Sequence, residues 1–379
     1  MRIDRADETG QISGRHEKSC IGNRTFNRTF AHILLFSITA LLSGADSYRK
    51  IHLFIDSHRE ELNRYFGSDR KKTPSYSTIR NIILNTSDSE LERIFREYGE
   101  FLLKDDSDGT FVHRDGKVLR GGCDKVDDIK PLQVMSAFAG SCGIIPGHEE
   151  AEEKSDEIPA ARKLIKELGL SGRIFTLDAL RCREETLRAA VGNGNDVIVQ
   201  VEENQKTLLN DCGIVADTSV PDDSFTEPAE KTRNRIESRR TAVFFSPSLT
   251  DAEKRSPAEA AVKVDRFRQV FDTKNKKWKN THETSFYVST EVLSAKKISH
   301  GIRGYWRIEN KNHYVRDVSM GEDRSRIRRN PHIFAKLRSF ALNILRKNKV
   351  KNVNRELFNR ELFKNCMNID RLFDYAGIF

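Results

Sequence analysis

Three acidic residues stand where they could support metal-dependent chemistry: Asp115, Asp178 and Glu309. Asp115 and Asp178 each lie at the end of a short apolar run typical of a β-strand, and Glu309 lies in a helix-like stretch rich in arginine and aromatic residues. A carboxylate at the end of a buried strand is held rigidly, and one from a nearby helix can join two such groups around hard cations. Mg²⁺ or Mn²⁺ would keep all three groups ionised despite their mutual repulsion.

Such a site would act on phosphodiesters. Two ions roughly 3.5 to 4 Å apart can activate a water or a 3′-hydroxyl on one side of the phosphorus and stabilise the leaving oxygen on the other. Each acid alone has an ordinary alternative, because an Asp after a strand is more often a turn or helix-capping residue. The three together, with arginines around the Glu, suggest metal-dependent chemistry on nucleic acid.

The sequence around these acids resembles a known family, the H repeat-associated (ISAs-type) insertion-sequence transposases of the DDE class. The resemblance spans residues 30 to 347, approximately, in consistent order. Its pieces are Leu42-Ser-Gly-Ala-Asp46, Pro74-Ser-Tyr-Ser-Thr-Ile-Arg80, Asp115-Gly-Lys-Val-Leu-Arg-Gly121, Val134-Met-Ser-Ala-Phe-Ala139, Lys154-Ser-Asp-Glu-Ile-Pro159, Leu177-Asp-Ala-Leu180, Glu203-Asn-Gln-Lys-Thr-Leu208 and Trp306-Arg-Ile-Glu-Asn310. The last piece continues through His313, Asp317-Val318 and Gly321 to Ile327.

The resemblance implies an α/β fold with an RNase H-like core and implies that Asp115, Asp178 and Glu309 are the catalytic and metal-binding triad. It implies a DNA transposase that hydrolyses the element's ends with two Mg²⁺ or Mn²⁺ ions, then transfers the freed 3′-hydroxyl into target DNA. The partners would be double-stranded DNA, at the terminal inverted repeats and the target, and a second copy of the chain in the synaptic complex. No nucleotide cofactor is implied. We assign DNA contacts to Lys117, Arg120, Arg303, Trp306, Arg307, His313, Arg316 and Arg326.

Two alternatives stay open. The chain could be an inactive or domesticated DNA-binding relic of such a transposase, or an RNase H-like structure-selective nuclease. Three departures from the family pattern bear on the first alternative: Tyr305 where relatives commonly have His, Glu202 where they have Lys, and Arg233-Asn-Arg235 where they tend to have His-Gly-Arg. A Glu facing DNA would repel phosphate, so these changes would weaken activity.

Charge is concentrated in one region of the 379-residue chain. The formal net charge is +9, yet residues 296 to 351 hold 16 Lys or Arg against four Asp or Glu. A concentrated basic region favours binding to the phosphate backbone, although a solvated helical face is the alternative. The six cysteines are scattered without zinc-ligand spacing, which indicates a reducing compartment. The family resemblance implies that this compartment is the bacterial cytoplasm, with nucleoid association.

The segment from Ala31 to Ala45 superficially imitates a signal peptide. It begins behind a polar leader and is short for a membrane span, so we interpret it as a buried helix and expect no membrane association.

The domain boundaries follow from composition and periodicity. Residues 1–28 form a predicted flexible leader, 29–105 a helical domain, 106–350 the catalytic domain with a β-rich insertion at about 210–285 between the second Asp and the Glu, and 351–379 a tail. Residues 75–84 could be the second helix of a helix-turn-helix, or could serve packing alone. Arg235, Arg239 and Arg240 of the insertion could grip DNA, although a solvated strand is the more common case.

The expected elements alternate within the catalytic domain. The helical domain before it is expected to hold helices at 31–42, 51–66, 75–84 and 89–103. In the catalytic domain we expect strands at 111–119 and 132–139, an exposed acidic loop at 148–157, a helix from 157, a strand at 174–177, a helix at 184–191 and a strand at 196–201. Further strands are expected at 236–245, 261–271 and 284–290, followed by a helix at 299–318 bearing Glu309 and a final helix from 331. On that last helix Lys336, Arg338 and Arg346 are expected on the exposed side.

Overall fold

A computed structural model describes residues 24–104, 111–118, 133–151, 157–179, 184–232, 234–245, 257–308, 314–348 and 355–375. These residues form two compact units. The helical unit takes its described residues from Met1–Tyr98 and Tyr314–Phe379, and the sheet unit takes them from Gly99–Val118 and Leu132–His313. The chain therefore leaves the helical unit, builds the sheet unit and returns.

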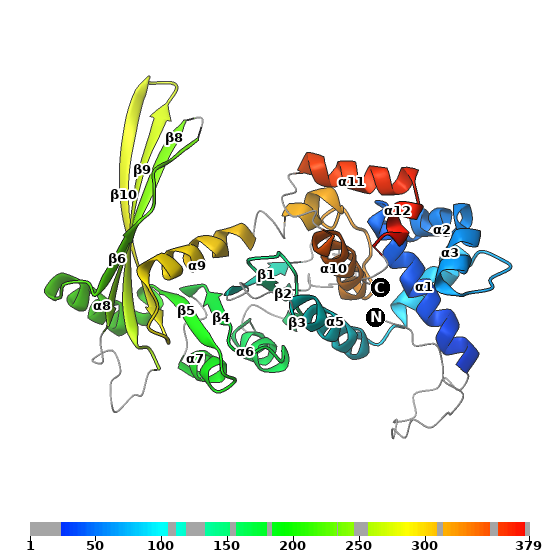
Figure 1. Ribbon diagram of the computed structural model, residues 1–379, viewed down its shortest axis with the longest axis horizontal. Helices are drawn as coiled ribbons and strands as arrows, with labels where there is room; N and C mark the ends of the chain where they lie inside the picture. The colour runs from blue at the N-terminus through cyan, green and yellow to red at the C-terminus, as the bar shows by residue number, and fades with distance from the viewer. Residues whose placement is uncertain are drawn as a thin grey trace. The chain divides into compact units, whose positions relative to one another are not determined.

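The helical unit contains the first and last helices of the chain (Figure 1). They are α1 (Arg24–Leu42), α2 (Tyr48–Ser57), α3 (Arg59–Phe66), α4 (Tyr76–Leu84), most of α5 (Asp88–Leu103), the π-helical turn η7 (Val315–Ser319), α10 (Pro331–Lys347), α11 (Arg355–Met367) and α12 (Asp370–Phe373). The prediction of a single helix at 51–66 is wrong, because one helix ends before His58 and a second begins after it. Gly67, at φ 63°, ends α3 in the left-handed conformation that glycine adopts without strain.

Helix α10 is buried on every side, so the exposed face expected for it is wrong. Lys336, Arg338 and Arg346 are at most 8% exposed. The charges are accommodated locally: Lys336 Nζ lies 2.5 Å from Asp88 and 3.3 Å from Glu92, and the Arg338 guanidinium lies 4.5 Å from the Phe334 ring centre. The reason is tertiary, since residues returning from the far end of the chain pack α10 against α1.

The sheet unit is built on one mixed sheet. Its strands are β1 (Phe111–Val118), β2 (Gln133–Ala139), β3 (His148–Ala151), β4 (Ile174–Leu177), β5 (Asp196–Val201), β6 (Asp223–Thr226), β7 (Glu230–Thr232), β8 (Arg235–Phe245), β9 (Ala260–Asp272) and β10 (Lys277–Ser289). They lie in the order β3-β2-β1-β4-β5-β10-β9-β8-β6, with β7 paired to β8. β1, β4 and β5 are parallel, β2 pairs antiparallel with β1, and β3 pairs antiparallel with β2.

Two expectations change here. Residues 148–151 are not part of an exposed loop, because they pair with β2 as an edge strand and His148 is buried. The expected β-rich insertion after Asp178 is present as strands β6 to β10, yet it is continuous with the core. Its strand β10 pairs with β5 from Phe286↔Val201 to Ser289↔Ile198.

Helices cover both faces of the core sheet (Figure 1). α6 (Glu157–Glu167) and α7 (Glu184–Val191) lie on one side and α9 (Ala295–Ile308) on the other, while α8 (Lys206–Thr218) follows β5 through a short 3₁₀ turn, Glu203–Gln205. The apolar contact under α9 includes Ile174, Ile198, Val262, Ile298 and Ile302. This cluster fixes α9 against the strands that bear the candidate site.

The predicted domain boundaries and the compact units divide the chain differently. Residues 314–348 join the N-terminal helices, whereas the prediction assigned them to the catalytic domain. The helix expected at 299–318 begins earlier, at Ala295, and is described to Ile308. Of the predicted leader, residues 1–23 lie outside the described residues and 24–28 belong to α1. No helix in the described part of the chain is long and apolar enough to cross a membrane.

Candidate active site

The backbone holds the strands that lead to the first two acids in a parallel register. β1 and β4 run parallel with Phe111 opposite Ile174 and His113 opposite Thr176. Continued by two residues, past the end of β4 at Leu177, this register would set Asp115 beside Asp178. Because neighbouring parallel strands lie about 4.8 Å apart, two residues in register are close enough for their carboxylates to share cations.

A buried polar contact locks the register two residues earlier. His113 Nδ1 and Thr176 Oγ1 form a hydrogen bond of 2.6 Å, and both side chains are buried. A one-residue slip between the strands would separate these groups and turn each strand's side chains to the other face. The bond therefore holds the two strands in the register that pairs the positions of the acids.

Helix α9 runs over the same strand at very close range. A Cβ added at Gly301 would collide with the Phe111 ring, and one at Gly304 would collide with the His113 imidazole. The two contacts advance together along helix and strand, so α9 travels toward the level of Asp115. Its described part ends at Ile308, immediately before Glu309.

The loop after β4 is held by an amide from the next strand's end. Asp178 is partly buried, and Ala179 is buried beside it. Asn204, in the turn after β5, donates its side-chain N–H to the Ala179 carbonyl at 2.8 Å. This bond fixes the backbone that follows Asp178, so Asn204 is placed to position that carboxylate.

The structure distributes the predicted DNA contacts between both units. In the sheet unit Lys117 is 7% exposed in β1, and Trp306 and Arg307 belong to the last turn of α9. Arg303 forms ion pairs with Glu227 at 3.0 Å and with Glu230. In the helical unit Arg316 is 1% exposed and pairs with Glu322 at 2.8 Å, whereas Arg326 is exposed. Glu309, Arg120 and His313 lie outside the described residues. Arg303 and Arg316 are thus engaged within the chain.

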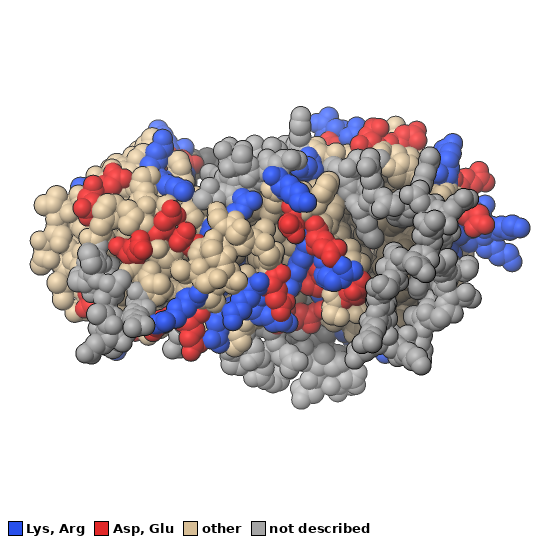
Figure 2. Space-filling view, turned by 60° about the horizontal axis from the view of Figure 1, so that its bottom comes forward, with Lys and Arg blue, Asp and Glu red and all other residues tan. Residues whose placement is uncertain are grey.

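The arginines of the insertion are also largely neutralised. Arg239 pairs with Glu227 and Glu237, and Arg266 reaches Glu237 at 2.9 Å. Burial would raise the pKa of Glu237, but the hydrogen bond from Arg266 and the nearby arginine charges outweigh it and lower that pKa. Figure 2 shows basic side chains interspersed with acidic ones over the visible face. Basic residues alone therefore do not mark a DNA-binding surface in this part of the chain.

Sequence reasoning missed the residues that position the acids. His113, Thr176, Asn204, Gly301 and Gly304 hold strands, loop and helix together without offering reactive groups of their own. Asn204 stands in the quoted Glu203-Asn-Gln piece, which was a usable signal. The two glycines three residues apart in a helix were another, because glycine inside a helix is unfavourable unless a close neighbour requires it.

Comparison with protein families matches two models to this chain. Residues 129–345 match the transposase DDE domain, and residues 23–99 match the DDE_Tnp_1-associated family. The first match covers most of the sheet unit and continues into α10.

Several curated relatives match over most of their length. YncI of Escherichia coli O157:H7, described as a candidate transposase, is 30% identical over 83% of this chain and 81% of its own. YhhI of Escherichia coli K12, described as an H repeat-associated candidate transposase, is 30% identical over 84% of this chain and 85% of its own. The solved synaptic complex of the piggyBac transposase with hairpin DNA aligns over 96% of this chain and 79% of that one at TM-score 0.41 and 11% identity.

Proposed function

This chain belongs to the DDE transposases, in the H repeat-associated group, and we propose that Asp115, Asp178 and Glu309 are its catalytic triad. The α/β sheet unit is its RNase H-like core, and the chain is a DNA transposase, an enzyme that cleaves DNA. The proposed reaction is metal-dependent cleavage at the element's ends followed by transfer of the freed 3′-hydroxyl into target DNA.

The observation that best supports this assignment is the shared register of β1 and β4. Asp115 and Asp178 stand the same number of residues apart as His113 and Thr176, which are in register and bonded to each other. Sequence proximity does not predict this match, because the register depends on how two strands far apart in the chain pair. Helix α9, which is described to Ile308, runs along β1 from Phe111 to His113.

The donor set fits hard divalent cations. Three carboxylates offer only anionic oxygen, the ligand that Mg²⁺ and Mn²⁺ prefer, and two of them come from adjacent strands that hold them rigidly. When bound, two such ions would activate the attacking oxygen and stabilise the leaving oxygen of an in-line displacement. The chain's own part is to hold the elements that carry these carboxylates in place, through the His113–Thr176 bond, the Asn204 amide and the α9 glycines.

The partners follow from this chemistry. We propose that the chain binds double-stranded DNA at the terminal inverted repeats and at the target, acts as a homodimer when the two ends are brought together, and works on the bacterial nucleoid. Arg120, Trp306, Arg307, His313 and Arg326 remain our proposed DNA contacts, as does Lys117. The ion pairs of Arg303 and Arg316 would have to open before either residue could bind phosphate.

Strand cleavage on the element's own flanking DNA tests the proposal. Wild type with Mg²⁺ should nick labelled ends to leave a 3′-hydroxyl and then join that end to target DNA. Glu309→Gln should bind the same DNA without nicking it. Metal-independent cleavage, or full activity of Glu309→Gln, would contradict the proposal. Binding without cleavage by both proteins would favour the inactive relic, and cleavage of branched DNA regardless of its terminal sequence would favour the structure-selective nuclease.

A further inference from the structure

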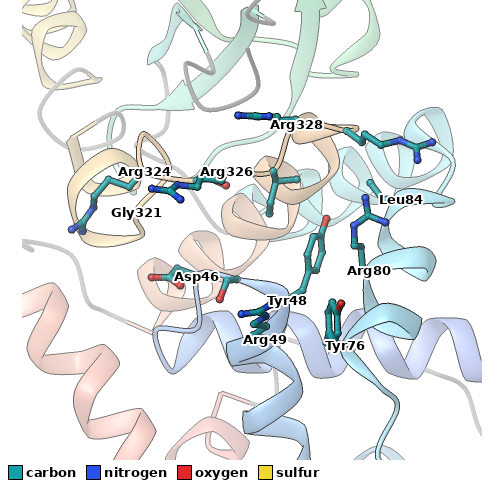
Figure 3. Close-up of a pocket in the computed structure, with 14 residues that line it drawn as sticks. Asp46, Tyr48, Arg49, Tyr76, Arg80, Leu84, Gly321, Arg324, Arg326 and Arg328 are labelled. Carbon is teal, nitrogen blue, oxygen red and sulfur yellow. The ribbon is translucent and has the colours of Figure 1, made fainter. Parts of the chain in front are cut away.

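A large cavity lies entirely within the helical unit, apart from the proposed catalytic site. Its volume is about 810 Å³. Three segments form its walls: the start of α2, helix α4 and the loop that leads into α10 (Figure 3). We name it the arginine pocket after six of its lining residues: Arg49, Arg80, Arg324, Arg326, Arg328 and Arg329.

The arginine pocket is strongly and openly cationic. Asp46 is its only lining carboxylate, and it already pairs with Lys50 at 2.8 Å. Arg80, Arg326 and Arg329 form no ion pair with any residue that the structure describes. In this they differ from Arg303 and Arg239, whose charges are neutralised within the chain. Mutual repulsion of clustered guanidinium groups is unfavourable, so an anion entering the pocket would relieve it.

The walls of the pocket are held in place by short polar bonds. Ser75 caps α4 by accepting the Thr78 backbone N–H at 3.2 Å. Asn330 adopts a left-handed backbone at φ 47°, which an Asn tolerates better than most residues, and donates its side-chain N–H to the Leu84 carbonyl at 2.8 Å. The loop that leads into α10 is thereby bonded to the end of α4, so its arginines are held in place before a ligand binds.

The wall around Tyr48 adds polar groups that lack partners. The buried Tyr48 hydroxyl has no hydrogen-bond partner among the described residues, and its ring packs edge-on against Phe334 at 5.5 Å. Behind it Arg338 is 2% exposed, and its Nε and Nη2 also find no hydrogen-bond partner among these residues. Burial lowers the pKa of Arg338 to about 10, so it stays charged at neutral pH. Burial raises the pKa of Tyr48 to about 12, so its hydroxyl remains a donor.

We infer that the arginine pocket binds the phosphate backbone of DNA, taking neighbouring phosphates of one strand. Planar guanidinium forks match phosphate oxygens in bidentate geometry, and several arginines from three segments suit a chain of phosphates better than one small anion. Tyr76 at the rim is 47% exposed and lies under Arg49. The inference rests on the proposed function, since it takes the transposase's DNA as the ligand.

Binding of a labelled short duplex over a range of salt concentrations tests this inference. Arg326→Ala combined with Arg329→Ala is the variant, because both residues are exposed and unpaired in the described structure and their loss should leave the fold intact. Arg360→Ala, an exposed arginine on α11 outside the pocket, is the matched control. The double variant should bind at least tenfold more weakly to element-end and unrelated duplexes alike. The slope of its log affinity against log salt concentration should be less negative than that of wild type by about two.

Other outcomes separate the two proposals. The pocket inference would be overturned if the double variant had the same DNA affinity and salt slope as Arg360→Ala, or if it lost binding to one DNA sequence only. It would also be overturned if inorganic phosphate bound in the pocket and DNA binding did not change. Asp178→Asn should bind DNA as wild type does. If wild type binds through the pocket yet never cleaves, the proposed function fails and the pocket stands. If the double variant binds and cleaves normally, the pocket fails and the proposed function stands.

Discussion

His113 and Thr176 join β1 to β4 through a buried 2.6 Å hydrogen bond, and their separation of 63 positions in the sequence is the same as that of Asp115 and Asp178. This hydrogen bond thus lies two residues before the proposed metal-binding residue on each of the two segments. We propose that the contact between His113 and Thr176 also keeps the two acids at one level.

Replacing Thr176 by Val removes the hydroxyl at nearly constant shape. The His113 imidazole then loses this partner in a buried site, which should lower the free energy of unfolding by about 1–3 kcal/mol and reduce strand cleavage. Thr218→Val is the control, because its hydroxyl bonds the Ile214 carbonyl on the exposed surface of α8. Chemical denaturation and cleavage assays would check both. Equal stability of the two variants would show that the buried bond does not lock the strands.

Replacing Gly304 by Ala tests the close approach of α9 to β1. The added methyl group must displace the His113 ring or the helix, and overpacking of this kind typically costs about 1–3 kcal/mol. Cleavage should fall further than stability, because a shift of α9 moves Glu309. Gly213→Ala in α8 meets nothing within 4 Å, so it should be neutral or stabilising by up to about 1 kcal/mol. A fully active, fully stable Gly304→Ala protein would refute the tight packing.

Replacing Asn204 by Ala removes the amide that holds the Ala179 carbonyl beside Asp178. We expect slower cleavage with unchanged DNA affinity, since the residue positions a carboxylate and does not touch substrate. Asn193→Ala removes the same kind of bond, from a side-chain amide to the Ala189 carbonyl, at an exposed helix end. Single-turnover rates at saturating DNA should separate them. If both variants cleave at the wild-type rate, Asn204 has no positioning role.

Glu237→Gln should weaken the arginine network of the insertion. Glu237 has a lowered pKa in the folded state, so its stabilising effect is present above the ordinary pKa of a Glu and is lost as pH falls through the folded value. At neutral pH we expect a loss of about 1–3 kcal/mol, discounted because the arginines are partly exposed. Glu283→Gln, at a 60% exposed position, should cost less than about 1 kcal/mol. Unfolding curves of wild type and Glu237→Gln should differ at neutral pH and converge at acidic pH.

The sequence predicted the parts of this fold that depend on local pattern. Buried runs such as Ile174–Leu177 and the helix at Glu184–Val191 appear where their periodicity places them. The failures are tertiary. Nothing local in Lys336 or Arg338 reveals that α10 is enclosed by helices from the other end of the chain, and the acidic run at 148–151 pairs as a strand because β2 offers it an edge.

The candidate site was likewise only partly predictable from the sequence. The acids themselves were identifiable from their positions after apolar runs and from the family resemblance. Their common level was not, because it depends on a register between strands far apart in sequence. The groups that hold them, such as the His113–Thr176 pair, look like ordinary core residues until the pairing is known.

The most direct test of the central claim is single-turnover cleavage of the element's end DNA by Asp115→Asn, Asp178→Asn and the double variant, with Asp211→Asn in exposed α8 as the control. Two ligands of one metal site act as a unit, so each single variant should lose nearly all cleavage and the double should lose little more. DNA binding should persist in all of them. Substantial cleavage by either single variant, or losses that simply multiply in the double, would contradict a shared site at Asp115 and Asp178.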